Sequence, residues 1–175
     1  EVAPELPASL QTIVVRGEVE DFASAGGRKV VSLATLLASG GDGGAPHRRH
    51  RNDVTYMFYS GGTTGTAKGI THLAHDFVLI PARHGPFWEY TADDVVFATS
   101  KKYFTHGLWP GVLIPLYWGA TIVLDRRPPT PEVVLGNLER HAVTKLITVP
   151  TVLKNLIDHT TAAGKTLRLP ALKLV

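Results

Sequence analysis

Short apolar segments alternate with helical patterns along most of this chain, and this alternation restricts the possible folds strongly. The strand candidates are rich in β-branched residues and apolar on both faces; they are residues 54–59, 95–99, 121–124, 145–149 and 172–175. Helical patterns lie between them, at 72–82, 108–118, 131–141 and 151–163. Strands of this kind are typical of a parallel sheet that is covered on both sides. The sequence therefore predicts an α/β fold, with a mostly parallel, doubly wound sheet flanked by helices.

Capping residues support two of these helices. Thr130 is suited to cap the helix at 131–141, where Pro131 would take the first helical position, and Gly164 follows the helix at 151–163 as a stop signal. In the apolar segment 108–118, Pro110 and Pro115 predict breaks or kinks.

The first third of the chain has a weaker pattern. It offers one strand at 12–15 and one short helix at 32–38, followed by glycine-rich and arginine-rich sequence up to Asp53. The basic tract at 47–51 lacks interleaved aromatic residues, so we interpret it as a solvated linker and predict no nucleic-acid partner. The expected organisation is a partial N-terminal segment with a linker at 1–52, and a truncated α/β subdomain at 53–175.

The loop from Tyr59 to Gly69 is rich in glycine and threonine and contains Lys68 near its end. Glycines bring backbone N–H groups close together, and hydroxyls and an ammonium add further partners for phosphate oxygens. An apolar strand precedes the loop and a helical pattern follows, which predicts the strand–loop–helix setting in which phosphates are often bound. The loop is not a Walker A sequence, because Ala67 precedes the lysine and Gly69 follows it.

The order of residues in this loop resembles the phosphate loop of the acyl-adenylate-forming superfamily, which includes acyl-CoA and aryl-CoA synthetases. It departs from that pattern at Gly61, where serine is usual, and at Ala67, where proline is usual. Segments 93–98, 102–108 and 115–121 resemble the benzoate–CoA ligase branch of the superfamily, and segment 145–151 resembles its later Val-Pro-Thr segment. The resemblance runs from about Asp53 to Val175 and implies part of the large N-terminal domain of such an enzyme.

This resemblance implies an enzyme that joins a carboxylic acid, expected to be an aryl acid, to a thiol through an acyl-adenylate. ATP, Mg²⁺ and coenzyme A would be its cofactors, and a carrier-protein thiol stays open as the acceptor. The acyl pocket would include His106 and Gly107, although a buried histidine bonded to a backbone carbonyl stays open as the alternative for His106. The phosphates of ATP would be held by Ser60, Gly61, Gly62, Thr63, Thr64, Gly65, Thr66 and Lys68.

Both ends of the chain look cut, so we expect a fragment of a larger synthetase whose partner is the remainder of that enzyme, including its C-terminal domain. No complete catalytic set is present in the fragment, and we therefore expect the isolated chain to be inactive.

Composition narrows the remaining classes of protein. The chain has no cysteine, which excludes a disulfide framework and a thiolate metal site, and a net charge of only +3. No metal site is predicted, because His72 and His75 lack further ligands, and we expect a local structural role for His72. Tyr103, Phe104 and Trp109 are predicted to be core residues. No stretch is apolar for the roughly 20 residues that span a bilayer, and no signal peptide is evident, so a cytoplasmic location without a membrane partner is expected.

Two other functions stay open at this point. The strand at 121–124 ends at Asp125, as a Walker B strand does, which would suit a P-loop NTPase or kinase with magnesium at that carboxylate. The other alternative is a non-catalytic nucleotide-binding module.

Overall fold

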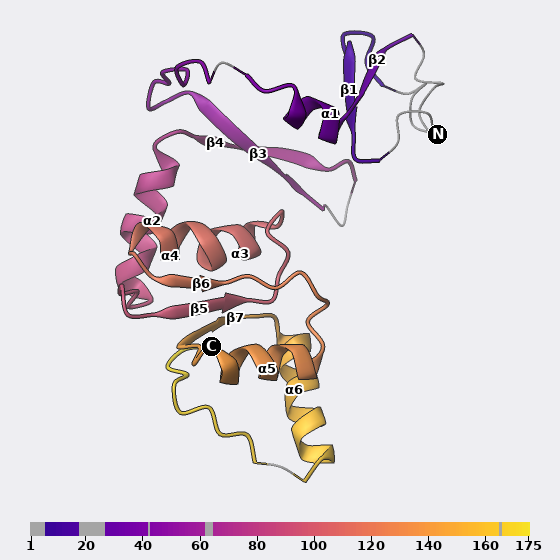
Figure 1. Ribbon diagram of the computed structural model, residues 1–175. Coiled ribbons are helices and arrows are strands. Elements are labelled where there is room, and N and C mark those ends of the chain that lie inside the picture. The colour runs from indigo at the N-terminus through magenta and orange to yellow at the C-terminus, as the bar shows by residue number, and fades with distance from the viewer. Residues whose placement is uncertain (1–5, 18–26, 42, 62–64, 165) are drawn as a thin grey trace. The chain divides into compact units, whose positions relative to one another are not determined.

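The computed structural model describes residues 6–17, 27–41, 43–61, 65–164 and 166–175 (Figure 1). The chain divides into two compact units, Glu1–Arg48 and Arg49–Val175. In the first unit, strand β1 (Thr12–Val15) pairs in parallel with β2 (Lys29–Ser32), and helix α1 (Leu33–Ala38) follows directly. The predicted strand at 12–15 and the short helix are confirmed, whereas β2 was not predicted. Ser32 caps α1, because its side chain accepts a hydrogen bond from the Thr35 backbone N–H.

The second unit is built on a three-stranded sheet in which every pair is parallel. Strand β5 (Val95–Ala98) lies between β6 (Thr121–Val123) and β7 (Lys145–Ile147). Phe97 faces Val123 on one side and Leu146 on the other, which fixes the register of all three strands. The strand predicted at 172–175 is reduced to one bridge, in which Leu174 pairs with Lys145.

Each face of this sheet carries its own hydrophobic core, as expected for strands that alternate between two covered faces. On one face Val96, Ala98 and Ile147 pack with Trp109 and Ile114. That face is covered by helix α2 (Asp76–Phe87) and by a helical segment made of α3 (Thr105–Leu108), a π-helical turn at 109–113 and α4 (Ile114–Tyr117) (Figure 1).

On the opposite face Phe97, Val123 and Leu146 pack against apolar residues of helices α5 (Pro131–Arg140) and α6 (Pro150–Ala162). Helices therefore cover both faces of a parallel sheet (Figure 1), and the predicted α/β fold is confirmed.

The local helix signals are confirmed where they were strongest. Thr130 caps α5, its side chain accepting from the Val133 backbone N–H, and Gly164 after α6 has a φ of +61°. The predicted break in segment 108–118 takes the form of the π-helical turn. Pro110 has no N–H to donate to the preceding turn, and within the π-helical turn the Ile114 N–H donates to the carbonyl of Trp109, five residues back.

The chain after the glycine-rich loop differs from the prediction. A second strand, β4 (Lys68–Leu73), follows the loop and pairs antiparallel with β3 (Val54–Ser60), so the setting is strand–loop–strand. The helix predicted at 72–82 begins only at Asp76 and continues to Phe87. Pairing with β3 satisfies the backbone groups of β4 as far as Leu73, so the helix cannot begin at His72.

Two of the predicted core aromatics are also placed differently. Trp109 is buried, as predicted, but the side chains of Tyr103 and Phe104 are 71% and 56% exposed. Both residues lie in the loop between β5 and α3 and not under a helix, which leaves their side chains exposed. The two rings pack on each other, with centroids 4.6 Å apart.

Candidate functional site

The predicted phosphate loop forms the tip of the β3–β4 hairpin. Ser60 and Lys68 are the last paired residues of the two strands, so they hold both ends of the loop together. Gly61, Thr66 and Lys68 are exposed. Gly65 has a φ of +154°, a conformation that side-chain-bearing residues rarely adopt. Gly62, Thr63 and Thr64, which also belong to the predicted site, lie outside the described residues.

The base of the hairpin is fixed to helix α2 through His72. Its imidazole stacks on the Tyr56 ring, with centroids 4.6 Å apart and planes 3° apart, and its Nδ1 lies 3.1 Å from Asp76 Oδ2. The Asp76 carboxylate also accepts from the Leu73 backbone N–H, which is the main cause that lowers its pKa. These contacts give His72 a structural role of the kind predicted.

His75 does not share a helix with His72. It lies at the N-cap of α2, with Nε2 3.5 Å from Asp76 Oδ1. In the described part of the chain, no group of three or more His, Asp or Glu side chains is arranged to hold a metal ion.

Two polar groups are buried behind the hairpin, namely the Tyr56 hydroxyl and the Trp109 indole N–H. Neither has a hydrogen-bond partner among the described residues. Burial, with a smaller effect of the Asp76 charge, raises the pKa of Tyr56 to about 12. Tyr56 therefore stays neutral at physiological pH and serves the hairpin as a packing residue, in ring contact with Phe77 and Trp109.

The predicted acyl-pocket residues begin helix α3. His106 is exposed, and its Nδ1 lies 3.1 Å from Ser100 Oγ. The alternative of a buried histidine bonded to a backbone carbonyl is therefore wrong. Gly107 is buried, and a Cβ atom added there would lie 2.1 Å from the Lys101 carbonyl oxygen. Glycine at this position lets the backbone at Ser100 and Lys101 pass close by, which is a requirement of the fold itself.

The predicted phosphate loop and the predicted acyl-pocket residue His106 do not contact each other directly. Among the residues that the structure describes, no hydrogen bond or ring contact links the loop at 60–68 to His106.

Asp125, the candidate magnesium ligand of the NTPase alternative, is already engaged. Arg127 binds both carboxylate oxygens, with Nε–Oδ1 and Nη2–Oδ2 distances of 3.0 and 2.6 Å, and Asn137 donates at 2.8 Å. These hydrogen bonds lower the pKa of Asp125. In addition Lys68 begins a strand, whereas a P-loop lysine lies where the loop opens a helix. The structure gives no support to the NTPase reading.

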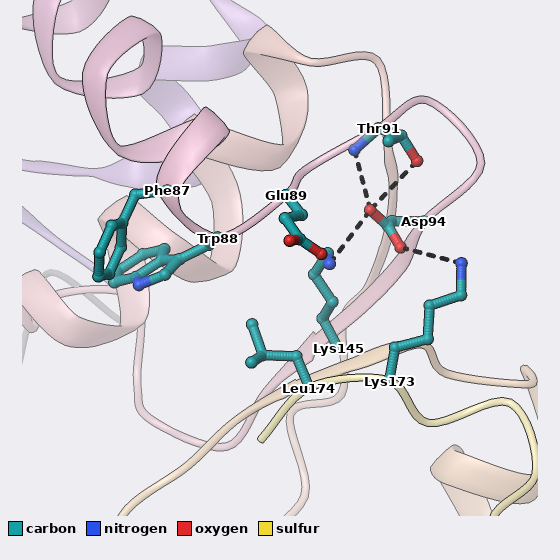
Figure 2. Close-up of a pocket in the computed structure, with 8 residues that line it drawn as sticks. All are labelled: Phe87, Trp88, Glu89, Thr91, Asp94, Lys145, Lys173 and Leu174. Atoms are coloured by element: carbon teal, nitrogen blue, oxygen red, sulfur yellow. Dashed lines mark hydrogen bonds and ion pairs between the residues drawn. The ribbon is translucent and has the colours of Figure 1, made fainter.

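A cavity of about 580 Å³ lies near the amino ends of β5 and β7, opposite the ends where open parallel sheets bind ligands (Figure 2). Asp94 is 1% exposed in its wall and accepts from the Thr91 N–H at 2.9 Å and from Thr144 Oγ1 at 2.7 Å. The ammonium groups of Lys145 and Lys173 lie 3.5 and 3.9 Å from its oxygens. Figure 2 shows the Thr91 and lysine contacts converging on this carboxylate. The positive charges of the two lysines are balanced by the carboxylates of Asp94 and Glu89 in the cavity lining. We therefore interpret this cavity as a structural feature and not as a ligand site.

None of the described helices is both long and apolar enough to cross a membrane.

Comparison with known proteins places this geometry in a family. The chain is 36% identical over 152 residues to a 4-hydroxybenzoate–CoA/benzoate–CoA ligase of Rhodopseudomonas palustris, covering 87% of this chain and 27% of that protein. It is 34% identical over 140 residues to a benzoate–CoA ligase of Thauera aromatica, covering 79% of this chain and 27% of the relative. The chain thus spans about a quarter of the length of these relatives.

Solved structures share the fold. The anthranilate CoA ligase AuaEII in complex with anthranoyl-AMP superposes with a TM-score of 0.64 and 29% identity, over 79% of this chain and 26% of that one. ATP-bound MatB from Rhodopseudomonas palustris gives a TM-score of 0.68 at 24% identity, over 84% and 31% of the two chains. The sequence profile of the AMP-binding enzymes matches residues 2–175, which is nearly the whole chain. With a two-sided parallel sheet and a glycine-rich hairpin loop in place, the chain belongs to the AMP-binding enzyme family.

Proposed function

We propose that this chain forms part of an ATP-dependent aryl-CoA synthetase. In the first step a carboxylate oxygen attacks the α-phosphorus of ATP, the bond to the bridging oxygen breaks, and pyrophosphate leaves. In the second step the thiol of coenzyme A attacks the acyl carbon and displaces AMP. The observation that carries the proposal is the 36% identity to an aryl-CoA ligase across 87% of the chain.

The loop at 60–68 is proposed to hold the β- and γ-phosphates of ATP and later the pyrophosphate. It offers exposed backbone at Gly61 and Gly65, a hydroxyl at Thr66 and the positive charge of Lys68, a donor set that suits phosphate oxygens. Gly62, Thr63 and Thr64 are proposed to complete this set, and Ser60 closes the hairpin beneath it. Catalysis of this kind depends on positioning and charge stabilisation more than on a protein nucleophile.

Magnesium is proposed to arrive as Mg-ATP. In such a complex the phosphate oxygens of the nucleotide supply part of the coordination of the magnesium ion. Coenzyme A is proposed as the thiol, in line with the names of the relatives.

His106 and Gly107 are proposed to border the aryl group of the acid. The His106 ring is exposed and oriented by Ser100, so one of its faces is available to an aromatic substrate. An aryl acid is favoured because the relatives named above are benzoate and anthranilate ligases.

The test is a pyrophosphate-exchange assay on the full-length protein that contains this chain, with benzoate, 4-hydroxybenzoate, anthranilate and aliphatic acids. We expect exchange that depends on an aryl acid. A Lys68→Ala variant should lose about 10²-fold in kcat/KM for ATP, the usual cost of removing one electrostatic contact to the transition state. Lys154→Ala, which removes an exposed lysine paired with Asp158 on α6, serves as the control.

Three results would count against the proposal. Acid-independent ATP hydrolysis would indicate an NTPase, saturable ATP binding without any exchange would indicate a binding module, and exchange with aliphatic acids alone would exclude the aryl substrate.

A further inference from the structure

One buried tryptophan joins the β3–β4 hairpin to the rest of its unit. The Trp109 side chain is 4% exposed and belongs to the hydrophobic core on one face of the three-stranded sheet. Its ring centroid lies 5.9 Å from that of Tyr56 on β3, 6.2 Å from that of His72 on β4 and 5.8 Å from that of Phe77 on α2. Trp109 is therefore the residue at which the hairpin, α2 and the sheet meet.

The face of the hairpin that contacts Trp109 is also the face that carries Lys68. Tyr56 is paired with His72, and Ser60, further along β3, is paired with Lys68. Side chains alternate along a strand and directly paired residues share a face, so the side chains of Tyr56, His72 and Lys68 lie on the same side of the hairpin. The pairing runs without a bulge from Tyr56 to Ser60. A tilt of the hairpin at Tyr56 is therefore carried along the paired strands to the lysine at its tip.

The other side of this contact leads to the proposed acyl pocket. Trp109 directly follows α3 in a continuous helical segment, and His106 lies about one helical turn before it. The helical backbone connects the two side chains, so a shift of Trp109 moves His106 with it. Because the phosphate loop and His106 lack a direct contact, the ring contacts of Trp109 with the hairpin provide a short route between them.

We propose that Tyr56 and Trp109 are positioning residues, which together set the phosphate loop relative to the acyl pocket. This inference rests on the proposed function. The carboxylate of the acid must reach the α-phosphorus of ATP while the loop holds the β- and γ-phosphates, so the reaction depends on the distance between the two parts of the site. A misplacement of about 1 Å in such an arrangement can cost about 10²-fold in rate. Tyr56 acts through Lys68, and Trp109 acts through His106.

The ring of Tyr56, and not its hydroxyl, makes this contact. The ring stacks on His72 with the two planes 3° apart, and His72 is fixed in turn by Asp76, with Nδ1 3.1 Å from Oδ2. The Tyr56 hydroxyl is buried without a hydrogen-bond partner among the described residues. Its removal therefore breaks no hydrogen bond within the described chain. Tyr56→Phe keeps the stacked ring, whereas Tyr56→Leu removes the ring and keeps an apolar side chain.

Pyrophosphate exchange with ATP and benzoate, on the full-length protein that contains this chain, tests the proposal. Tyr56→Leu should lower kcat by about tenfold or more, and Tyr56→Phe should keep it within about twofold of the wild type. Isothermal titration calorimetry measures the dissociation constants of Mg-ATP and of benzoate separately. Each constant should change by less than about threefold in Tyr56→Leu, because each ligand still meets intact binding residues and only their relative placement is disturbed.

Two further variants separate positioning from a general loss of stability. Val134→Ala opens a cavity in the core on the opposite face of the sheet, so it should lower the melting temperature and leave kcat unchanged at temperatures where the protein is folded. His72→Gln removes the ring stacked on Tyr56 and keeps a hydrogen-bonding group near Asp76, and it should lower kcat as Tyr56→Leu does. Circular dichroism checks the folding of each variant, and His72→Gln carries the test if Tyr56→Leu does not fold.

The proposal is refuted if the folded Tyr56→Leu and His72→Gln variants keep the wild-type kcat, or if Val134→Ala loses as much. An equal loss in Tyr56→Phe would also refute it, because the hydroxyl and not the ring would then be responsible. Weaker binding of ATP or benzoate with an unchanged kcat would indicate a local binding role instead. All of these outcomes leave the synthetase proposal standing, since that proposal fails only through the wild type, and both proposals fall together if the wild type shows no exchange.

Discussion

Asp94 and Lys145 form a buried ion pair whose two halves should contribute very unequally to stability. The Asp94 side chain is 1% exposed and that of Lys145 is 4% exposed, and their charged groups are 3.5 Å apart. Replacing Asp94 by asparagine leaves the Lys145 ammonium buried without its counter-charge and turns an amide group toward existing donors. Breaking one side of a buried pair in this way costs about 3–5 kcal/mol of unfolding free energy.

Replacing Lys145 by methionine should cost less, below about 2 kcal/mol. At an effective dielectric constant of about 20, the attraction lost at this distance is about 5 kcal/mol, and relief of the ammonium's desolvation, several kcal/mol, offsets most of it. Asp94 also keeps its hydrogen bonds from Thr91 and Thr144 and its contact with Lys173. The double variant should therefore be no less stable than Asp94→Asn alone.

Urea unfolding followed by tryptophan fluorescence measures all three variants, because Trp88, Trp109 and Trp118 lie in or against the core of the same unit. If Lys145→Met costs as much as Asp94→Asn, the two residues do not contribute unequally to stability. If the two losses simply add in the double variant, the two charges are not coupled.

The pH dependence gives an independent check. Burial alone would raise the pKa of Asp94, but hydrogen bonds from Thr144 and Thr91, together with Lys145 and Lys173, lower it overall. A lowered folded-state pKa means that the carboxylate stabilises the fold above its unfolded pKa of about 3.9 and loses this effect as the pH falls through the folded value. The stabilities of the wild type and of Asp94→Asn should therefore converge on acidification below about pH 4.

Three further predictions concern the fold and the activity. Gly107→Ala should destabilise the protein by about 1–3 kcal/mol or more in the same urea experiment, since the new Cβ meets the Lys101 carbonyl. Gly136→Ala in α5, where space is open, should instead stabilise the protein by about 0.5–1 kcal/mol. Equal effects of the two variants would contradict the packing at Gly107. Thr130→Ala should cost about 0.5–2 kcal/mol by removing the cap of α5, and Thr130→Asn should restore most of it; no loss in the alanine variant would exclude the cap. The 175-residue chain alone should show no carboxylate-dependent pyrophosphate exchange, because it spans 27% of the length of its ligase relatives; any exchange above the buffer control would be the contrary result.

Local chemistry explains which parts of the fold could be predicted from sequence. Helix α5 begins where Thr130 and Pro131 predict it, because capping depends only on neighbouring residues. The parallel strands were recognisable because they are rich in β-branched residues and apolar on both faces. Strand β4 was not recognisable, because it forms only by pairing with β3. In addition, the sequence at 72–82, which overlaps the end of β4, has a helical spacing.

The same distinction between local and non-local contacts applies to the polar clusters. The glycine-rich loop is contiguous, so its phosphate-binding character is visible in a single stretch of sequence. The buried contacts of Asp94 with Lys145 and Lys173 join segments that lie far apart in the sequence, and no local pattern connects them.

The hairpin that carries the glycine-rich loop makes the site sensitive to the register of its two strands. Ser60 and Lys68 face each other at the end of a ladder that runs back to Val54 and Leu73. Because side chains alternate across a strand, a slip of β4 by one residue would carry Lys68 to the opposite face of the hairpin. A residue inserted between Lys68 and His72 would therefore turn the lysine away from any phosphate held by the loop.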